Sequence, residues 1–129
     1  MNGSYLLDTN IVIALFQREA AVQERLAAAD VVFIPTIVLG ELYFGAWKSS
    51  RAEENTVLVD EFASGRSILG CDRHVAREYG LIKTRLREKG RPLPENDIWI
   101  AAIAREHGLI LITRDSHFQD VEDLKWERW

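Results

Sequence analysis

Three short, uninterrupted apolar runs constrain most strongly how this chain can fold. Residues 4–7, 31–34 and 109–113 are each brief and almost wholly apolar, and the last reads "LILIT". Strands that are buried on both faces of a parallel sheet have this composition, whereas half-buried strands alternate apolar and polar residues. Weaker runs at residues 67–70 and 124–126 would form the edges. Together the runs predict a mostly parallel sheet of about five strands.

Segments with helical periodicity separate these runs. We expect helices at residues 10–18, 36–48, 52–63, 72–89 and 95–107. Parallel strands need crossover connections of about a dozen residues or more, and such connections are usually helical. The alternation therefore predicts a three-layer α/β/α sandwich, with helices on both faces of the sheet.

The length and composition of the chain suit one hydrophobic core. The chain has 129 residues, of which 47% are hydrophobic and 28% charged, and it contains no repeat or low-complexity segment. We therefore expect residues 1–129 to form a single domain. No apolar run approaches the roughly 18 residues that a membrane span needs, and the first three residues carry no basic stretch. These features predict a cytoplasmic protein without membrane contact.

Cysteine content and net charge narrow the kinds of site that the chain can form. Cys71 is the only cysteine, which excludes an internal disulfide and a multi-thiolate zinc site within one chain. A metal bound here would take oxygen ligands. The net charge of -4 argues against a protein held to nucleic acid by bulk positive charge. Acids gathered around a metal ion would be neutralised by it, so charge alone leaves the partner open.

Four acidic residues stand where the expected fold could bring them together. Asp8 ends the first strand, and Asp115 follows "LILIT" by two residues. Ligands of open α/β sheets bind beyond the carboxyl ends of the strands. Glu41 lies in the nearly apolar helix "TIVLGELYFGA", where a carboxylate without a partner is costly to bury. Asp97 opens the helix after "RPLPEN", so all four could converge at one end of the sheet.

Each of these acids alone also has a purely structural interpretation. Asp8 could cap the helix that follows it, and Asp97 could interact with the dipole of its own helix. Asp115 could make turn hydrogen bonds within "TRDSH". Glu41 could belong to an ion pair or reach solvent. The four acids taken together favour a shared site more than any one of them does.

Clustered carboxylates require a cation if they are all to remain ionised. Without one, mutual repulsion forces some of them to take up protons. Oxygen ligands suit Mg²⁺ or Mn²⁺ better than zinc. One or two such ions can activate water and stabilise the leaving oxygen of a phosphodiester. The acids therefore indicate metal-assisted phosphodiester hydrolysis.

The four acidic segments also resemble those of a known family. "LLDTNIVIAL", "TIVLGELYFGA", "LPENDIWIAAIA" and "LILITRDSHF" are similar, in this order, to the acidic motifs of the PIN-domain family, and within it to VapC-type ribonuclease toxins. The resemblance covers essentially the whole chain. It implies an endoribonuclease of the PIN fold that uses Mg²⁺ or Mn²⁺. It also implies the toxin of a type II toxin-antitoxin pair, with a cognate antitoxin and a homodimer.

The resemblance assigns roles to individual residues. It implies that catalysis and metal binding rest on the four acids Asp8, Glu41, Asp97 and Asp115. Asp8 and Asp97 match the positions that hold the principal ion most directly, and Glu41 would join through the ion or its water. The last acid occupies the most variable position of the family. Thr9 and Thr113 match hydroxyl positions that could orient a water or an acid.

An RNA substrate would need positive charge near these acids, and "KTRLREKGR" at residues 83–91 supplies most of it. Arg85, Arg87 and Arg91 lead into the loop before the third acid, and Arg114 precedes the fourth. These arginines could guide phosphates toward the site. The alternative is that the basic run is simply a solvated helix face.

The three histidines suggest no general base for attack by a ribose 2′-hydroxyl. We expect His107 at a helix end and His74 on a charged helix surface. His117 follows Asp115 by two residues and could touch substrate, although a surface role is expected for it. Attack by external water is therefore favoured, which would leave 5′-phosphate and 3′-hydroxyl ends.

Aromatic residues on the helix that carries Glu41 hint at an interaction surface. Tyr43, Phe44 and Trp47 lie on this helix, and the next segment, "AEENTVLVDEFASG", reads as a second amphipathic helix. The two could form a helical arm with an apolar groove for a partner helix. The alternative is that the aromatic residues only pack in the core.

Other protein classes fit the four acids less well. A receiver-type signalling domain needs a neighbouring acidic pair after the first strand, and "LLDTN" offers one acid. A haloacid-dehalogenase-like phosphatase needs a second Asp two positions after the first, where this chain has Asn10. The remaining alternative is a catalytically idle PIN-like module that binds RNA or protein. Loss of one of the four acids would indicate it, and all four are present.

Overall fold

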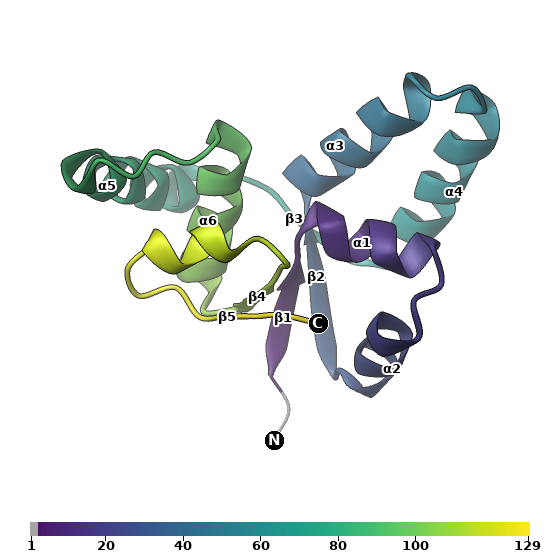
Figure 1. Ribbon diagram of the computed structural model, residues 1–129, viewed down its shortest axis with the longest axis horizontal. Helices are drawn as coiled ribbons and strands as arrows, with labels where there is room; N and C mark the ends of the chain where they lie inside the picture. The colour runs from purple at the N-terminus through teal and green to yellow at the C-terminus, as the bar shows by residue number, and fades with distance from the viewer. Residues whose placement is uncertain (1–2) are drawn as a thin grey trace.

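A five-stranded, entirely parallel sheet forms the centre of the computed structural model, which describes residues 3–129 (Figure 1). The strand order is β3-β2-β1-β4-β5, and every neighbouring pair runs parallel. The strands are β1 (Ser4–Leu7), β2 (Val31–Pro35), β3 (Ser67–Leu69), β4 (Ile110–Ile112) and β5 (Trp126–Glu127). The predicted α/β/α sandwich is confirmed, and both weak strands lie at the edges of the sheet, as expected.

Six α-helices and one 3₁₀ helix connect the strands. They are α1 (Thr9–Phe16), α2 (Ala20–Ala28), α3 (Thr36–Trp47), α4 (Ala52–Ser64), α5 (Arg73–Lys89), α6 (Glu95–His107) and the 3₁₀ helix η1 (Ser116–Asp120). In Figure 1, α5 and α6 lie on one side of the sheet, and α1 and α2 lie on the other. No helix among residues 3–129 combines the length and the apolar character that crossing a membrane would require.

Helices α2 and η1 were not predicted from the sequence. In α2, only Val22 is buried, so the segment lacks the apolar stripe by which an amphipathic helix is recognised. Its alanine-rich sequence nevertheless favours a helix by intrinsic propensity. The predicted helix at residues 10–18 is also shorter than expected, because α1 ends at Phe16 and Arg18 has a positive φ of 60°.

The core explains why the central strands read as continuous apolar runs. Leu6 and Leu7 of β1 and Leu111 and Ile112 of β4 are fully buried, because both faces of these strands are covered. Helix α6 adds a run of buried residues from Ile100 to Ala104. The glycines after α5 and α6, Gly90 and Gly108, have positive φ values of 69° and 64°, which let each helix end in a left-handed cap.

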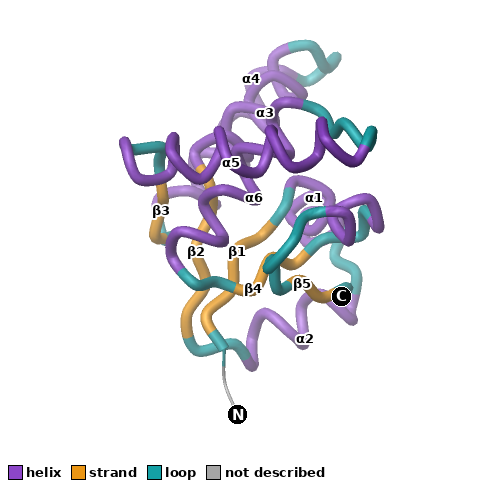
Figure 2. Tube along the Cα trace, turned by 90° about the vertical axis from the view of Figure 1, so that its left-hand side faces the viewer, coloured by secondary structure: helices purple, strands orange, loops and turns teal. Residues whose placement is uncertain are grey.

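The parallel arrangement brings several loops to the carboxyl end of the sheet. Strand β1 leads directly into α1, and β2 leads into α3. Leu7 of β1 lies opposite Ile112 of β4, so the residues that follow these two strands start at the same level. Helices α3 and α4 form a hairpin that extends beyond this end of the sheet (Figures 1 and 2). The residues after β1 and β4 are therefore placed to share one site.

Burial in the central strands should dominate the stability of this sheet. We predict that Ile112→Ala, at a fully buried position in β4, lowers the free energy of unfolding by about 2–5 kcal/mol because it leaves a cavity. Ile68→Ala is the matched control, since Ile68 lies in edge strand β3 and is 38% exposed. Measured by urea unfolding, Ile68→Ala should lower the free energy of unfolding by under about 1.5 kcal/mol. Equal losses for the two variants would contradict this account of the core.

Candidate active site

Asp8 is buried at the junction of β1 and α1, with 3% of its surface exposed. Its backbone N–H donates to the carbonyl of Ile112 at 3.0 Å, which continues the pairing of β1 with β4. The Oδ1 atom accepts from the N–H of Thr9 at 2.8 Å, and Oδ2 accepts from the hydroxyl of Thr113 at 2.8 Å. Asp8 therefore caps α1, as its structural interpretation held, and also presents its carboxylate at the carboxyl end of the sheet.

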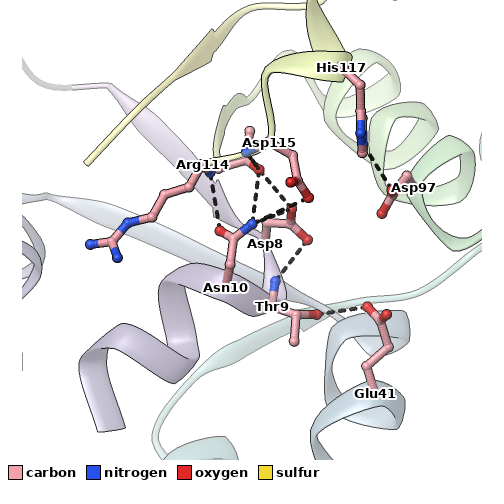
Figure 3. Close-up of polar contacts among 9 residues, drawn as sticks. Asp8, Thr9, Asn10, Glu41, Asp97, Arg114, Asp115 and His117 are labelled. Carbon is pink, nitrogen blue, oxygen red and sulfur yellow. Dashed lines mark hydrogen bonds and ion pairs between the residues drawn. The ribbon is translucent and has the colours of Figure 1, made fainter. Parts of the chain in front are cut away.

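Asn10 holds the loops after β1 and β4 together, a role that sequence reasoning missed. Its Oδ1 accepts from the N–H of Arg114 at 3.2 Å. Its Nδ2 lies 3.4 Å from Oδ2 of Asp8 and 3.5 Å from Oδ2 of Asp115 (Figure 3). This amide therefore spaces two carboxylates. Its position two residues after Asp8, in the first turn of α1, was the only signal in the sequence.

Glu41 approaches from α3, on a different part of the chain. Its Oε1 accepts a hydrogen bond from the hydroxyl of Thr9 at 2.7 Å. Within residues 3–129, no Lys or Arg forms an ion pair with it. Thr9 thus donates to both neighbouring carboxylates, to Asp8 through its N–H and to Glu41 through its hydroxyl. The ion-pair interpretation of Glu41 is not supported.

Asp97 lies in the first turn of α6, where its carboxylate is partly buried. The Oδ2 atom of Asp97 is 3.0 Å from Nε2 of His117 (Figure 3). Burial raises the pKa of Asp97, His117 lowers it, and the charges of Asp115 and Glu41 raise it. The expectation that His117 has only a surface role is therefore corrected, because η1 folds back against α6.

The four predicted acids line one hollow with a volume of about 600 Å³. Its lining consists of Asp8, Thr9, Asn10, Ile13, Glu41, Pro94, Glu95, Asn96, Asp97 and Asp115. No Lys or Arg occurs in this lining among the described residues, so no cationic side chain of the lining offsets the charge of the four carboxylates. The pKa of Asp8 reflects this arrangement. Burial, and then the charges of Asp97 and Asp115, raise its pKa to about 6, although hydrogen bonds from Thr113 and Thr9 oppose the rise.

These observations fit a divalent cation. The donors are carboxylate oxygens supported by hydroxyl and amide groups, which is the ligand chemistry of Mg²⁺ or Mn²⁺. A cation among these carboxylates would attract them. This attraction would offset the mutual repulsion that contributes to the raised pKa of Asp8. The residues present therefore fit a divalent ion with oxygen ligands.

The arginines proposed for substrate contact do not line the acidic hollow. Arg114 directs its guanidinium away from the four acids of the hollow (Figure 3). It binds Glu19 through two hydrogen bonds of 2.8 and 3.2 Å. Its Nε donates to the carbonyl of Trp129 at 3.1 Å, and Arg128 donates to the carbonyl of Arg114 at 2.6 Å. These contacts tie the loop after β4 to the C-terminal residues.

The three arginines of the basic run at residues 83–91 have different surroundings. Arg85 pairs with Glu88 at 3.2 Å on the exposed face of α5. Arg87 lines a separate hollow of about 400 Å³ that shares Glu95 with the acidic hollow. Arg91 is exposed in the loop before α6 and lines neither hollow. Of these three arginines, Arg87 is the one that lines a hollow sharing a residue with the acidic hollow.

A second groove adjoins the acids between α1, α3 and α4. Its volume is about 330 Å³, and it shares Thr9, Ile13 and Glu41 with the acidic hollow. The remaining lining is mainly apolar and includes Phe16, Gln17, Leu42, Gly45, Ala46, Asn55, Leu58 and Val59. Phe44 and Trp47 on α3 are exposed and do not pack in the core. The predicted arm with an apolar groove is therefore present, but none of the three aromatic residues of α3 that suggested it lines the groove.

Comparison with known proteins agrees with this geometry. The family model for the PIN domain matches residues 5–124, so the chain belongs to the PIN-domain family. Its relatives include proteins named ribonuclease VapC2 from Haemophilus influenzae, with 38% identity over 97% of both chains. Another is named tRNA(fMet)-specific endonuclease VapC from Shigella flexneri, with 35% identity over 97% of both chains.

Solved structures place the chain in the same group. A VapBC2 complex from Rickettsia felis, bound to a promoter DNA fragment, has a chain with a TM-score of 0.90 and 31% identity, covering 97% of this chain and 98% of that one. A DNA-bound VapBC from Salmonella typhimurium gives a TM-score of 0.91 and 30% identity, covering 100% and 99%. The expected resemblance to VapC-type proteins is confirmed in sequence and in fold.

The raised pKa of Asp8 predicts a pH-dependent stability for the metal-free protein. Because this pKa rises from 3.8 to about 6 on folding, the folded chain binds more protons than the unfolded chain within this window. The contribution of Asp8 to the free energy of unfolding should therefore fall as the pH rises through this window. The amide introduced by Asp8→Asn cannot ionise, so the free energy of unfolding of this variant relative to wild type should rise by about 1–3 kcal/mol between pH 4 and pH 7.5.

Urea unfolding with chelator present measures this difference. As a control, Mn²⁺ at pH 7.5 should stabilise the wild type more than Asp8→Asn, because binding to the folded state alone raises stability. If the difference in the free energy of unfolding between wild type and Asp8→Asn stayed constant from pH 4 to pH 7.5, the account of Asp8 would be contradicted.

Proposed function

We propose that residues 1–129 form a single-domain, Mg²⁺- or Mn²⁺-dependent endoribonuclease, the toxin of a toxin-antitoxin pair. The observation that carries the proposal is the convergence of Asp8, Glu41, Asp97 and Asp115 on one hollow without a lining Lys or Arg. The choice of RNA as substrate is supported by relatives whose names are ribonuclease or endonuclease VapC.

The chain's own residues would prepare the site for hydrolysis. Asp8 and Asp97 would hold the ion most directly, with Glu41 and Asp115 completing the acidic set. When bound, the ion supplies an activated water and stabilises the leaving oxygen of the phosphodiester. Hydrolysis by external water at this site would leave 5′-phosphate and 3′-hydroxyl ends.

Hydroxyl and amide groups would keep these carboxylates in place. Thr113 and the N–H of Thr9 each occupy one oxygen of Asp8, which limits rotation of the carboxylate. The hydroxyl of Thr9 orients Glu41, and Asn10 spaces Asp8 from Asp115. Side chains fixed in this way need little reorganisation during the reaction.

An antitoxin is the second proposed partner. The structural relatives are chains of VapBC complexes, and here the apolar groove between α1, α3 and α4 opens onto Glu41. An amphipathic helix laid in such a groove would bury the exposed apolar residues of α4 and approach the acids. The homodimer, the cytoplasmic location and the lack of membrane contact remain predictions.

The nuclease activity can be tested with end-labelled RNA. The purified chain should cut RNA with Mg²⁺ or Mn²⁺, stop when chelator is added, and leave 5′-phosphate ends. Asp8→Asn should lower the rate at least about 100-fold, because it removes a charge on which the site depends. Asp30→Asn is the matched control, since Asp30 lies just before β2 at the amino end of the sheet.

Folded, metal-loaded wild type that cuts no RNA would overturn the proposal. It would instead support the catalytically idle PIN-like module that binds RNA or protein. Cutting that persists unchanged in Asp8→Asn would also reject the assigned site.

The groove can be tested with the product of a small reading frame next to the gene, co-expressed as a candidate antitoxin. Leu58→Glu should weaken co-purification at least about 10-fold, because a charge would enter the apolar groove. Leu81→Glu is the matched control, since Leu81 lies on α5 and is 41% exposed, compared with 42% for Leu58. Equal loss in both variants would argue against the groove as the binding surface.

A further inference from the structure

His117 lies beside the proposed metal site but is not one of the residues to which a role in that site has been assigned. The short helix η1, which follows Asp115, carries it back toward α6. The next residue, Phe118, is fully buried, and its ring centroid is 4.9 Å from that of His117. The N–H of Phe118 donates to the carbonyl of Asp115 at 3.4 Å. The imidazole is therefore attached to a turn that is anchored in the core.

The ring is directed toward Asp97 rather than toward open solvent. Nε2 lies 3.0 Å from Oδ2 of Asp97, a carboxylate that precedes His117 by 20 residues in the chain (Figure 3). His117 does not line the acidic hollow itself, so it reaches Asp97 from the flank of η1. Among the described residues, this is the only histidine that contacts one of the four acids.

The spacing of potential ligand atoms suits one metal ion. One ring nitrogen of His117 and one carboxylate oxygen each of Asp97 and Asp115 all lie within 4.8 Å of one another. Adjacent ligands of an octahedral ion with bonds of about 2.1 Å lie about 3.0 Å apart, and opposite ligands about 4.2 Å apart. The separation of 3.0 Å between Nε2 and Oδ2 matches the adjacent pair.

We propose that His117 supplies a nitrogen ligand to the divalent ion held by Asp97 and Asp115, and that it makes the site prefer Mn²⁺ to Mg²⁺. This inference rests on the proposed function, because it concerns the same metal site. Carboxylate oxygens bind either ion, whereas imidazole nitrogen binds transition metals and contributes little to Mg²⁺. With the ion in place, the neutral ring carries its proton on Nδ1 and presents its Nε2 lone pair.

A purely positioning role makes a different prediction. In that role His117 only donates a hydrogen bond to Asp97, the ion is bound by oxygen alone, and a glutamine that donates the same bond restores the site. A nitrogen ligand cannot be replaced in this way, so a direct view of the ion's ligands separates the two.

Pulsed electron paramagnetic resonance of Mn²⁺ bound to the full chain gives that view. The wild type should show hyperfine coupling to an imidazole nitrogen, and His117→Gln should lose it. In calorimetric titrations, His117→Gln should weaken Mn²⁺ binding about 10-fold or more and change Mg²⁺ binding less than about 3-fold. His74→Gln, on α5, is the matched control and should leave the coupling and both affinities unchanged.

The outcomes distinguish this inference from the proposed function. Bound Mn²⁺ without nitrogen coupling in the wild type, or coupling that persists in His117→Gln, overturns the nitrogen ligand and leaves the nuclease intact. Failure of the wild type to bind Mn²⁺ while it still binds Mg²⁺ overturns the nitrogen ligand alone, and failure to bind either ion overturns both. Because the wild-type spectrum is decisive by itself, the test does not depend on the stability of the variant.

Discussion

Pairing between β1 and β4 is the interaction on which the rest of the site depends. Leu7 lies opposite Ile112, and the N–H of Asp8 donates to the carbonyl of Ile112. This register puts the carboxylate of Asp8 next to the hydroxyl of Thr113. A shift of one residue in either strand would turn its side chains to the opposite face of the sheet. The buried residues of the two strands therefore determine where the acid points.

Much of this arrangement could be predicted from the sequence, because it follows from burial. Continuous apolar runs identify strands that are covered on both faces, and the intervening helical segments supply the crossover connections that parallel strands need. The carboxyl ends of such strands face one side, which is why Asp8 and Asp115 could be expected together. Glu41 could be identified because a carboxylate in an apolar helix is unfavourable unless a polar group meets it. In the structure that group is the hydroxyl of Thr9.

What the sequence did not reveal are polar contacts between distant segments. Asn10 bonds to the backbone of Arg114, 104 residues away, and His117 reaches Asp97 across 20 residues. No periodicity marks such pairs, because each depends on how a loop is anchored. The direction of Arg114 depends likewise on Glu19, which lies just before α2, an element that apolar periodicity did not identify. Local pattern therefore locates the acids, while tertiary packing decides which groups support them.

The attachment of Arg114 to the C-terminal residues has a practical consequence for handling the protein. Arg114 donates to the carbonyl of Trp129, and Arg128 donates to the carbonyl of Arg114. The residue that follows Arg114 is Asp115, so these two hydrogen bonds connect the last two residues of the chain to the loop that carries the fourth carboxylate. An affinity tag, a surface-immobilisation handle or a fluorescent fusion joined at Trp129 would therefore start beside the hydrogen bonds that hold this loop, whereas the same addition before β1 would start at the opposite, amino end of the sheet.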